Sequence, residues 1–234
     1  MKSAARAKLV RTLTGGLLAL LPALAAPAAE LEVEVRNAAG RPASDVVVML
    51  LPASAATAAT LPPAAPPTVD IVQKDNRFEP YVTAVPAGAR VRFINRDRYD
   101  HHVRSLGSGP MGAVPPAKSF ELRLGAAQAG DKAVGEVLFD APGSVTLGCH
   151  IHGSMRGHLF VAATPWVAVT DAQGRARFAG LPDGAAEMRL WHPDQIAGQA
   201  PQTLQLAGSS SASAQLGFNP SRRPAPRAKG EYEF

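Results

Sequence analysis

The sequence predicts an all-β protein of the antiparallel sandwich type. Short apolar segments alternate with turns rich in Pro, Gly, Asn and Asp through most of the chain. No part of 69–161 shows convincing helical periodicity. A stretch made almost entirely of Ala, Pro, Thr and Ser at 52–68 separates an early pair of strands from the later ones.

The first 28 residues are expected to be a secretory signal peptide. Four basic residues come first, an apolar run covers 13–24, and small residues near 25–28 offer cleavage sites. The run is short for the ~30 Å hydrocarbon core of a bilayer, so a membrane anchor is the weaker alternative. Removing this segment leaves 20 Lys and Arg against 19 Asp and Glu, which does not indicate nucleic-acid binding. We expect an exported, periplasmic protein with no membrane span after cleavage and no nucleic-acid partner.

The strands are predicted from hydrophobic patterning. Apolar and acidic residues alternate through 31–35, which is typical of a half-buried strand, whereas 46–51 is apolar and more buried. The later strands are predicted at 69–73, 81–85, 89–95, 102–106, 120–124, 134–139, 144–149, 157–161, 166–170, 175–178 and 186–192. A weaker pattern covers 204–218, in which the Ser-rich 209–213 is expected to be a loop.

Two segments are expected to lack regular structure. Apart from Leu61, the linker at 52–68 lacks the large apolar side chains needed to offset the entropy cost of ordering. The C-terminal segment 219–234 is Pro-rich and basic, and we expect a disordered basic tail.

Cys149 is the only cysteine in the chain. In an exported protein a lone thiol must be buried, reactive, paired between chains or bound to metal. His152 and Met155 follow at the third and sixth positions, which favours metal binding. A thiolate with two histidines and a weak methionine is the ligand set of an electron-transfer copper site.

The second histidine of such a site has to come from another segment, and His101 and His102 are the obvious candidates. Adjacent residues on an extended chain point to opposite sides, so only one of the two can face the metal. The residues alone leave both choices open.

The remaining histidines are expected to have ordinary roles. His150 should point away from the metal and be partly exposed, because a second metal centre needs several further histidines. His158 and His192 are interpreted as surface or interface residues.

Residues 95–103, NRDRYDHHV, and 148–155, GCHIHGSM, together resemble the ligand segments of the cupredoxins. The pattern is N-x-D-x-x-x-H-x-V, followed about fifty residues later by C-x-x-H-x-x-M, and its short loop is most similar to that of amicyanin. Plastocyanin-like periplasmic proteins, including methylamine-utilisation types, are also similar. The resemblance implies a Greek-key cupredoxin sandwich at 69–162 with one type 1 (blue) copper ion. It implies the ligands His101, Cys149, His152 and Met155, and it places His102 where many cupredoxins carry an asparagine that links the ligand loops.

A second resemblance concerns the segments on either side of this region. Residues 30–51 and 164–218 are similar to the opening and continuation of the carboxypeptidase-regulatory-like (transthyretin-like) sandwich. The resemblance implies that the cupredoxin domain is inserted into a smaller, split β-sandwich. We therefore expect 31–51 to pair with strands after Trp166. The alternative is a single cupredoxin domain with elongated ends.

These resemblances imply a periplasmic protein that carries single electrons and is not an enzyme. Its partners would be redox proteins of the dehydrogenase or cytochrome c type, docking on the His152 face. The first alternative is copper binding or delivery without electron transfer. The second is an interaction module in which the split sandwich is the functional part.

Overall fold

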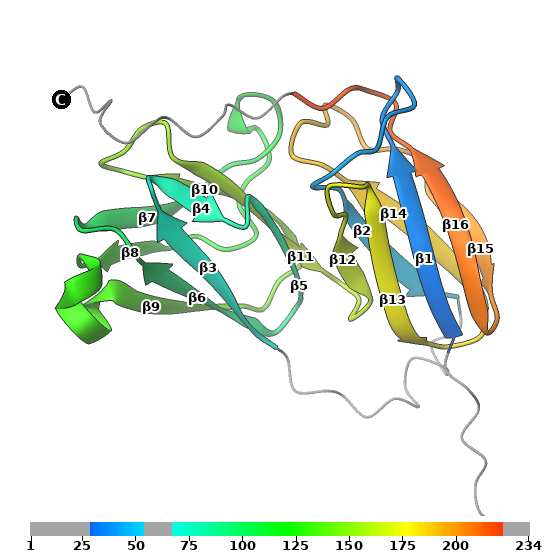
Figure 1. The fold of residues 1–234 in the computed structure, drawn as a ribbon, viewed down its shortest axis with the longest axis horizontal. Helices are drawn as coiled ribbons and strands as arrows, with labels where there is room; N and C mark the ends of the chain where they lie inside the picture. Colours follow the sequence, from blue (N-terminus) through cyan, green and yellow to red (C-terminus); the bar gives the residue numbers. More distant parts are fainter. Residues whose placement is uncertain (1–28, 54–66, 222–234) are drawn as a thin grey trace, which may run out of the picture.

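The structure, a computed structural model, describes residues 29–53 and 67–221, which form two β-sandwich units lying side by side (Figure 1). The expected signal peptide, most of the linker and most of the basic tail lie outside the described residues.

Strands dominate the described part of the chain, which confirms the all-β prediction. In chain order the elements are β1 (Ala29–Arg36), β2 (Val47–Pro52), β3 (Thr68–Lys74), β4 (Arg77–Glu79), β5 (Val82–Pro86), β6 (Ala89–Asn95), β7 (His101–Leu106), η1 (Pro110–Gly112), β8 (Glu121–Leu124), η2 (Ala127–Ala133), β9 (Val134–Phe139), β10 (Gly143–Cys149), β11 (Arg156–Ala162), β12 (Val167–Val169), β13 (Arg175–Leu181), β14 (Gly184–Trp191), β15 (Gln202–Leu206) and β16 (Ser209–Gln215). No helix in the described ranges has the length and apolar character needed to cross a lipid bilayer.

The first unit contains β3 to β11 in two sheets, with strand orders β5-β11-β10-β7-β8 and β4-β3-β6-β9. Strand β6 shows why these segments fold this way. Val91 and Phe93 are fully buried, while Arg90 and Arg92 alternate with them and reach solvent. Each buried side chain of this kind contributes about 1.5–3 kcal/mol relative to exposure, so the alternation fixes which face of the strand meets the core.

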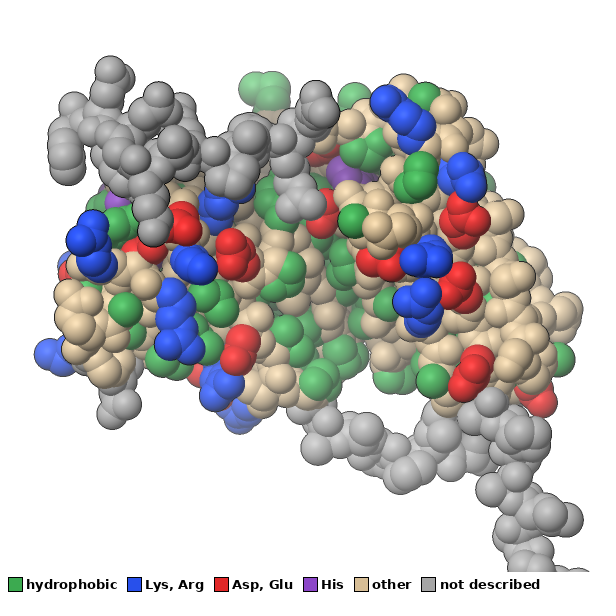
Figure 2. Space-filling model, viewed as in Figure 1, with side chains coloured by type: hydrophobic (Ala, Val, Ile, Leu, Met, Phe, Trp, Pro, Cys, Tyr) green, Lys and Arg blue, Asp and Glu red, His purple; other side chains and the backbone are tan. Residues whose placement is uncertain are grey.

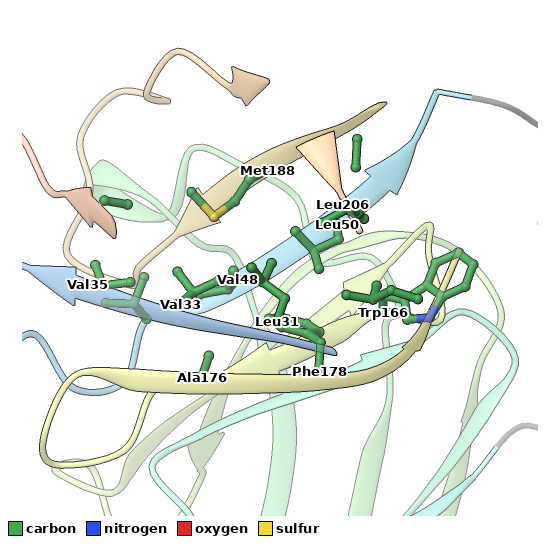
Figure 3. Packing of buried hydrophobic residues seen from close by; sticks show 14 of the residues in the cluster. Leu31, Val33, Val35, Val48, Leu50, Trp166, Ala176, Phe178, Met188 and Leu206 are labelled. Atoms are coloured by element: carbon green, nitrogen blue, oxygen red, sulfur yellow. The ribbon is translucent and has the colours of Figure 1, made fainter. Parts of the chain in front are cut away.

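The second unit combines β1 and β2 with β12 to β16, in sheets ordered β13-β1-β16 and β12-β2-β14-β15. Its core lies between these two sheets and includes Leu31, Val33, Leu50, Trp166 and Met188 (Figure 3). The early strands thus pair with strands that follow Trp166, the pairing expected from the sequence. The assignment of this unit to the carboxypeptidase-regulatory-like family stays a prediction.

Two features differ from the sequence interpretation. Three strand pairs are parallel (β1–β16, β3–β6 and β5–β11), because the chain crosses to another sheet between the paired strands. The Ser-rich segment expected as a loop at 209–213 is instead part of the edge strand β16. Its small inward residues Ala212 and Ala214 pack on the core, and its pairing with β1 overrides the weak strand propensity of serine.

An apolar interface joins the two units. Val47 and Met49 of β2 pack against Val82 of β5 and Ala162 of β11 in one buried cluster. Along this boundary Figure 2 shows hydrophobic side chains, whereas Lys and Arg are interspersed with Asp and Glu over the outer surfaces. The second unit therefore covers the part of the β5-β11-β10-β7-β8 sheet's outer face that is formed by β5 and β11.

Candidate metal centre

Two neighbouring strands bring the predicted ligands together. His101 is the first residue of β7, and Cys149 is the last residue of β10, which pairs with β7 in the register Cys149↔Val103. Both side chains are directed inward, and each is only 1% exposed. The residues after Cys149 form a short loop that returns to the sheet at β11 and carries His152 and Met155.

The nitrogen and sulfur atoms of three predicted residues converge. Nδ1 of His101 lies 3.6 Å from Sγ of Cys149, and Nδ1 of His152 lies 3.5 Å from the same sulfur. The ligand atoms of the three residues are all within 4.8 Å of one another, and no other group of three His, Cys, Asp or Glu meets this condition in the described ranges. The set includes His101 and excludes His102.

Met155 lies in the same buried cluster as the thiol. Its side chain is 1% exposed, and both residues belong to the core of the first unit. The backbone N–H of Met155 donates to the carbonyl of His152 at 2.9 Å, which closes the loop into a tight turn. The seven residues from Cys149 to Met155 and the neighbouring strand β7 thus carry a thioether, a thiol and two imidazoles.

A buried carboxylate orients His101. Oδ2 of Asp97 lies 2.8 Å from Nε2 of His101, and Asp97 is 7% exposed. Its oxygens also accept backbone N–H groups from Asp75 at 2.7 Å and Asn76 at 3.2 Å. With Nε2 donating to Asp97, Nδ1 is left with its lone pair toward the thiol, the tautomer that a metal ligand requires. Sequence reasoning noted the N-x-D motif but gave Asp97 no role.

Asn95 holds the turn that carries Asp97. Its Oδ1 accepts the backbone N–H of Asp97 at 2.8 Å, and its Nδ2 donates to the carbonyls of Tyr99 and Gly125, each at 2.8 Å. The side chain is buried, so these three bonds also satisfy its polar groups. The histidine ligand therefore sits at the end of a braced loop.

The surroundings of the sulfur favour a thiolate. Burial raises the pKa of Cys149, but hydrogen bonds from the protonated ring of His101, the His102 backbone N–H and His152 lower it to about 6. The His102 N–H lies 3.4 Å from Sγ. For His101, burial lowers the pKa, and hydrogen bonds with Cys149 and Asp97 outweigh that effect and raise it. Donor bonds to sulfur stabilise its negative charge in a water-poor site.

The other histidines lie outside this centre. At the position expected to link the ligand loops, His102 makes the link through its backbone, whose carbonyl accepts the N–H of His150 at 2.9 Å. His158 lies at the boundary between the units, where its ring contacts Tyr81. The expectation of a surface or interface position is wrong for His192, which is buried in the second unit.

The donor set fits copper. One thiolate, two imidazoles and a buried thioether are soft and borderline donors that match a copper ion better than hard cations such as magnesium or calcium. The centre is buried and preformed, with the imidazole of His152 half-buried at its outer side. It is a candidate site for a single copper ion.

No protein-family model and no curated protein matches the sequence. Among solved structures, the chain is similar to the Cu-containing nitrite reductase (NirK) from Thermus scotoductus SA-01, at 25% identity and a TM-score of 0.34, over 44% of this chain and 23% of that one. It is similar to a purple cupredoxin from Nitrosopumilus maritimus at 17% identity and a TM-score of 0.33, and the match covers 40% of this chain and 99% of that one. It is also similar to amicyanin from Paracoccus versutus at 18% identity and a TM-score of 0.32, and the match covers 48% of this chain and 97% of that one. The chain thus spans under a quarter of the nitrite reductase.

Proposed function

We propose that this protein is a periplasmic type 1 copper protein that carries single electrons between redox partners. The observation that carries the proposal is the convergence of His101 Nδ1 and His152 Nδ1 on the buried Cys149 sulfur, at 3.6 and 3.5 Å. This is a one-cysteine, two-histidine donor set, with the Met155 thioether buried nearby.

His101, Cys149 and His152 would hold the copper ion, and Met155 would be the weak fourth ligand. When bound, copper supplies a one-electron couple between Cu(I) and Cu(II). The protein supplies rigidity, because Asp97 fixes the ring of His101 and the neighbouring strands fix Cys149. A donor set that is already assembled needs little rearrangement when the charge of the site changes.

The electron would enter and leave through His152. Its ring is half-buried and packs against Tyr99 with ring centroids 5.4 Å apart, and the next residue toward Cys149, Ile151, is 54% exposed. An exposed apolar side chain beside a partly exposed ligand suits brief docking of a redox protein of the dehydrogenase or cytochrome c type.

Loading the purified chain with Cu(II) tests the proposal. We expect an intense visible thiolate-to-copper absorption that bleaches on reduction, is lost in Cys149→Ala and persists in His150→Ala, whose imidazole lies outside the centre. Reoxidation by a cytochrome c should restore the colour. A colourless protein that binds only Cu(I) would contradict electron transfer and favour copper delivery.

A further inference from the structure

The residues that follow two of the candidate ligands form a separate cluster on the outside of the sheet. His102 follows His101, and His150 follows Cys149. While the first residue of each pair is buried, His102 is half-buried and His150 is exposed. Their ring centroids lie 5.5 Å apart, and the backbone bond from His150 N–H to the His102 carbonyl keeps the two positions together.

A carboxylate completes this outer cluster. Oε2 of Glu121, on the neighbouring strand β8, lies 3.3 Å from Nε2 of His102. The side chain of Glu121 is 62% exposed and that of His102 is 15% exposed. Glu121 and His150 are both at the surface, so their side chains are free to change rotamer, as closing the three donors onto an ion would require.

We propose that His102, His150 and Glu121 form a second metal site, open to solvent, that binds Cu(II). Two imidazole nitrogens and a carboxylate oxygen suit the tetragonal N,O coordination of Cu(II), with water filling the remaining positions. The sequence analysis expected His150 to have no metal role, because a second metal centre needs several further histidines. The pairing of β7 with β10 supplies that imidazole.

Nearby positive charge limits the affinity of this site for cations. Arg123 is directly opposite His102 in the β7–β8 register, and Arg104 lies two residues further along β7 on the same face. Both guanidinium groups oppose binding of a cation, and Glu121 offsets one of them. The repulsion is the same for any divalent ion, so the preference for Cu(II) over Zn(II) comes from the higher affinity of Cu(II) for imidazole and carboxylate ligands.

Copper titration of the full chain tests this proposal separately from the electron-carrier proposal. At micromolar free Cu(II) we expect two ions to bind, the second with an ordinary tetragonal electron paramagnetic resonance spectrum and no thiolate absorption. His150→Ala should weaken the second ion by about tenfold or more, since it removes one of two imidazole ligands. Ile151→Ala, which changes the adjacent exposed side chain and removes no donor, should bind both ions like the unmodified chain.

Three further variants separate the sites and test the charges. The double variant Cys149→Ala, His152→Ala removes the buried donors and should retain the outer ion, with two imidazole nitrogens seen by pulsed electron paramagnetic resonance. Glu121→Gln should weaken this ion and Arg123→Gln should tighten it. The proposal is overturned if no ion binds to the double variant. It is also overturned if His150→Ala leaves the affinity of the outer ion and the number of its imidazole ligands unchanged.

Discussion

The Nε2 atom of His101 lies 2.8 Å from Oδ2 of Asp97, and both side chains are almost completely buried. The same carboxylate accepts the backbone N–H groups of Asp75 and Asn76 in the β3–β4 turn. One side chain therefore connects a candidate metal ligand to a turn of the opposite sheet.

Replacing Asp97 with Asn should weaken both the centre and the fold. The amide can replace only some of these bonds, so we expect copper affinity to fall by about 10–100-fold and the free energy of unfolding by about 1–3 kcal/mol. Copper competition titration and denaturant unfolding measure the two effects. Asp100→Asn is the matched control, because Asp100 is an exposed carboxylate that accepts one backbone N–H, from Ala126. Equal copper affinity in both variants would show that Asp97 does not orient His101.

His158 should make the stability depend on pH. Burial, with repulsion from His192 and Arg156, outweighs the attraction of Asp194 and lowers the pKa of His158 from the usual 6.5 to about 4. Between pH 6.5 and about 4 the unfolded chain therefore binds more protons than the folded chain. The free energy of unfolding rises with pH across this range, and this stability is lost as the pH falls through it. The change is up to about 3 kcal/mol.

Comparing urea unfolding of the unmodified chain and His158→Gln from pH 4 to 7 checks this dependence. The difference between their stabilities should shrink toward acidic pH, because the variant lacks the titrating ring. An NMR titration that gives His158 an ordinary pKa would show the prediction to be wrong.

Trp191→Ala should uncouple the two units. Trp191 ends β14 and packs against Phe160 of β11 with ring centroids 5.0 Å apart, within the cluster that joins the units. Truncating a partly buried tryptophan should cost about 2–4 kcal/mol, and calorimetry should show two separated unfolding transitions. Ile196→Ala, at a residue that is 85% exposed, should change little. A single, unshifted transition in Trp191→Ala would mean that this contact does not couple the units.

Two glycines near the candidate centre should respond differently to alanine. A Cβ at Gly157 would lie 2.8 Å from Cβ of Phe78, whereas a Cβ at Gly153 would meet nothing within 4 Å. Overpacking at Gly157 should therefore destabilise the fold by about 1–3 kcal/mol, while Gly153→Ala should stay within about 0.5 kcal/mol. Thermal unfolding compares the two, and a stable Gly157→Ala would contradict the packing given for β11.

Strand positions were predictable where side chains alternate clearly. Strands β6 and β9 have the bounds expected from the sequence, and in β6 Arg90 and Arg92 alternate with the apolar Val91 and Phe93. Strand β16 was missed, since serine carries little strand preference and its order comes from pairing with β1. The short β4 was missed because three residues give too little pattern, and it exists through its bonds to β3.

The sequence was sufficient to predict which residue types supply the donors of the candidate site, but only part of their arrangement in space. The spacing of Cys149, His152 and Met155 is local, so the sequence alone brings these donors into one loop. The choice between His101 and His102 depended on resemblance at the sequence level, and the structure brings His101 to the sulfur. The buried bond from Asp97 to His101 and the outer pairing of His102 with His150 had no clear sequence signal.

The sequence by itself determined the strand class, the chemistry of the donors and the separation of the early strands from the later ones, because alternation, residue type and spacing are local properties. Only the tertiary structure decided which histidine faces Cys149, which carboxylate supports it and which outward side chains meet. Those outcomes depend on the register between β7, β8 and β10, and that register is set by packing the inner residues of both sheets into one core.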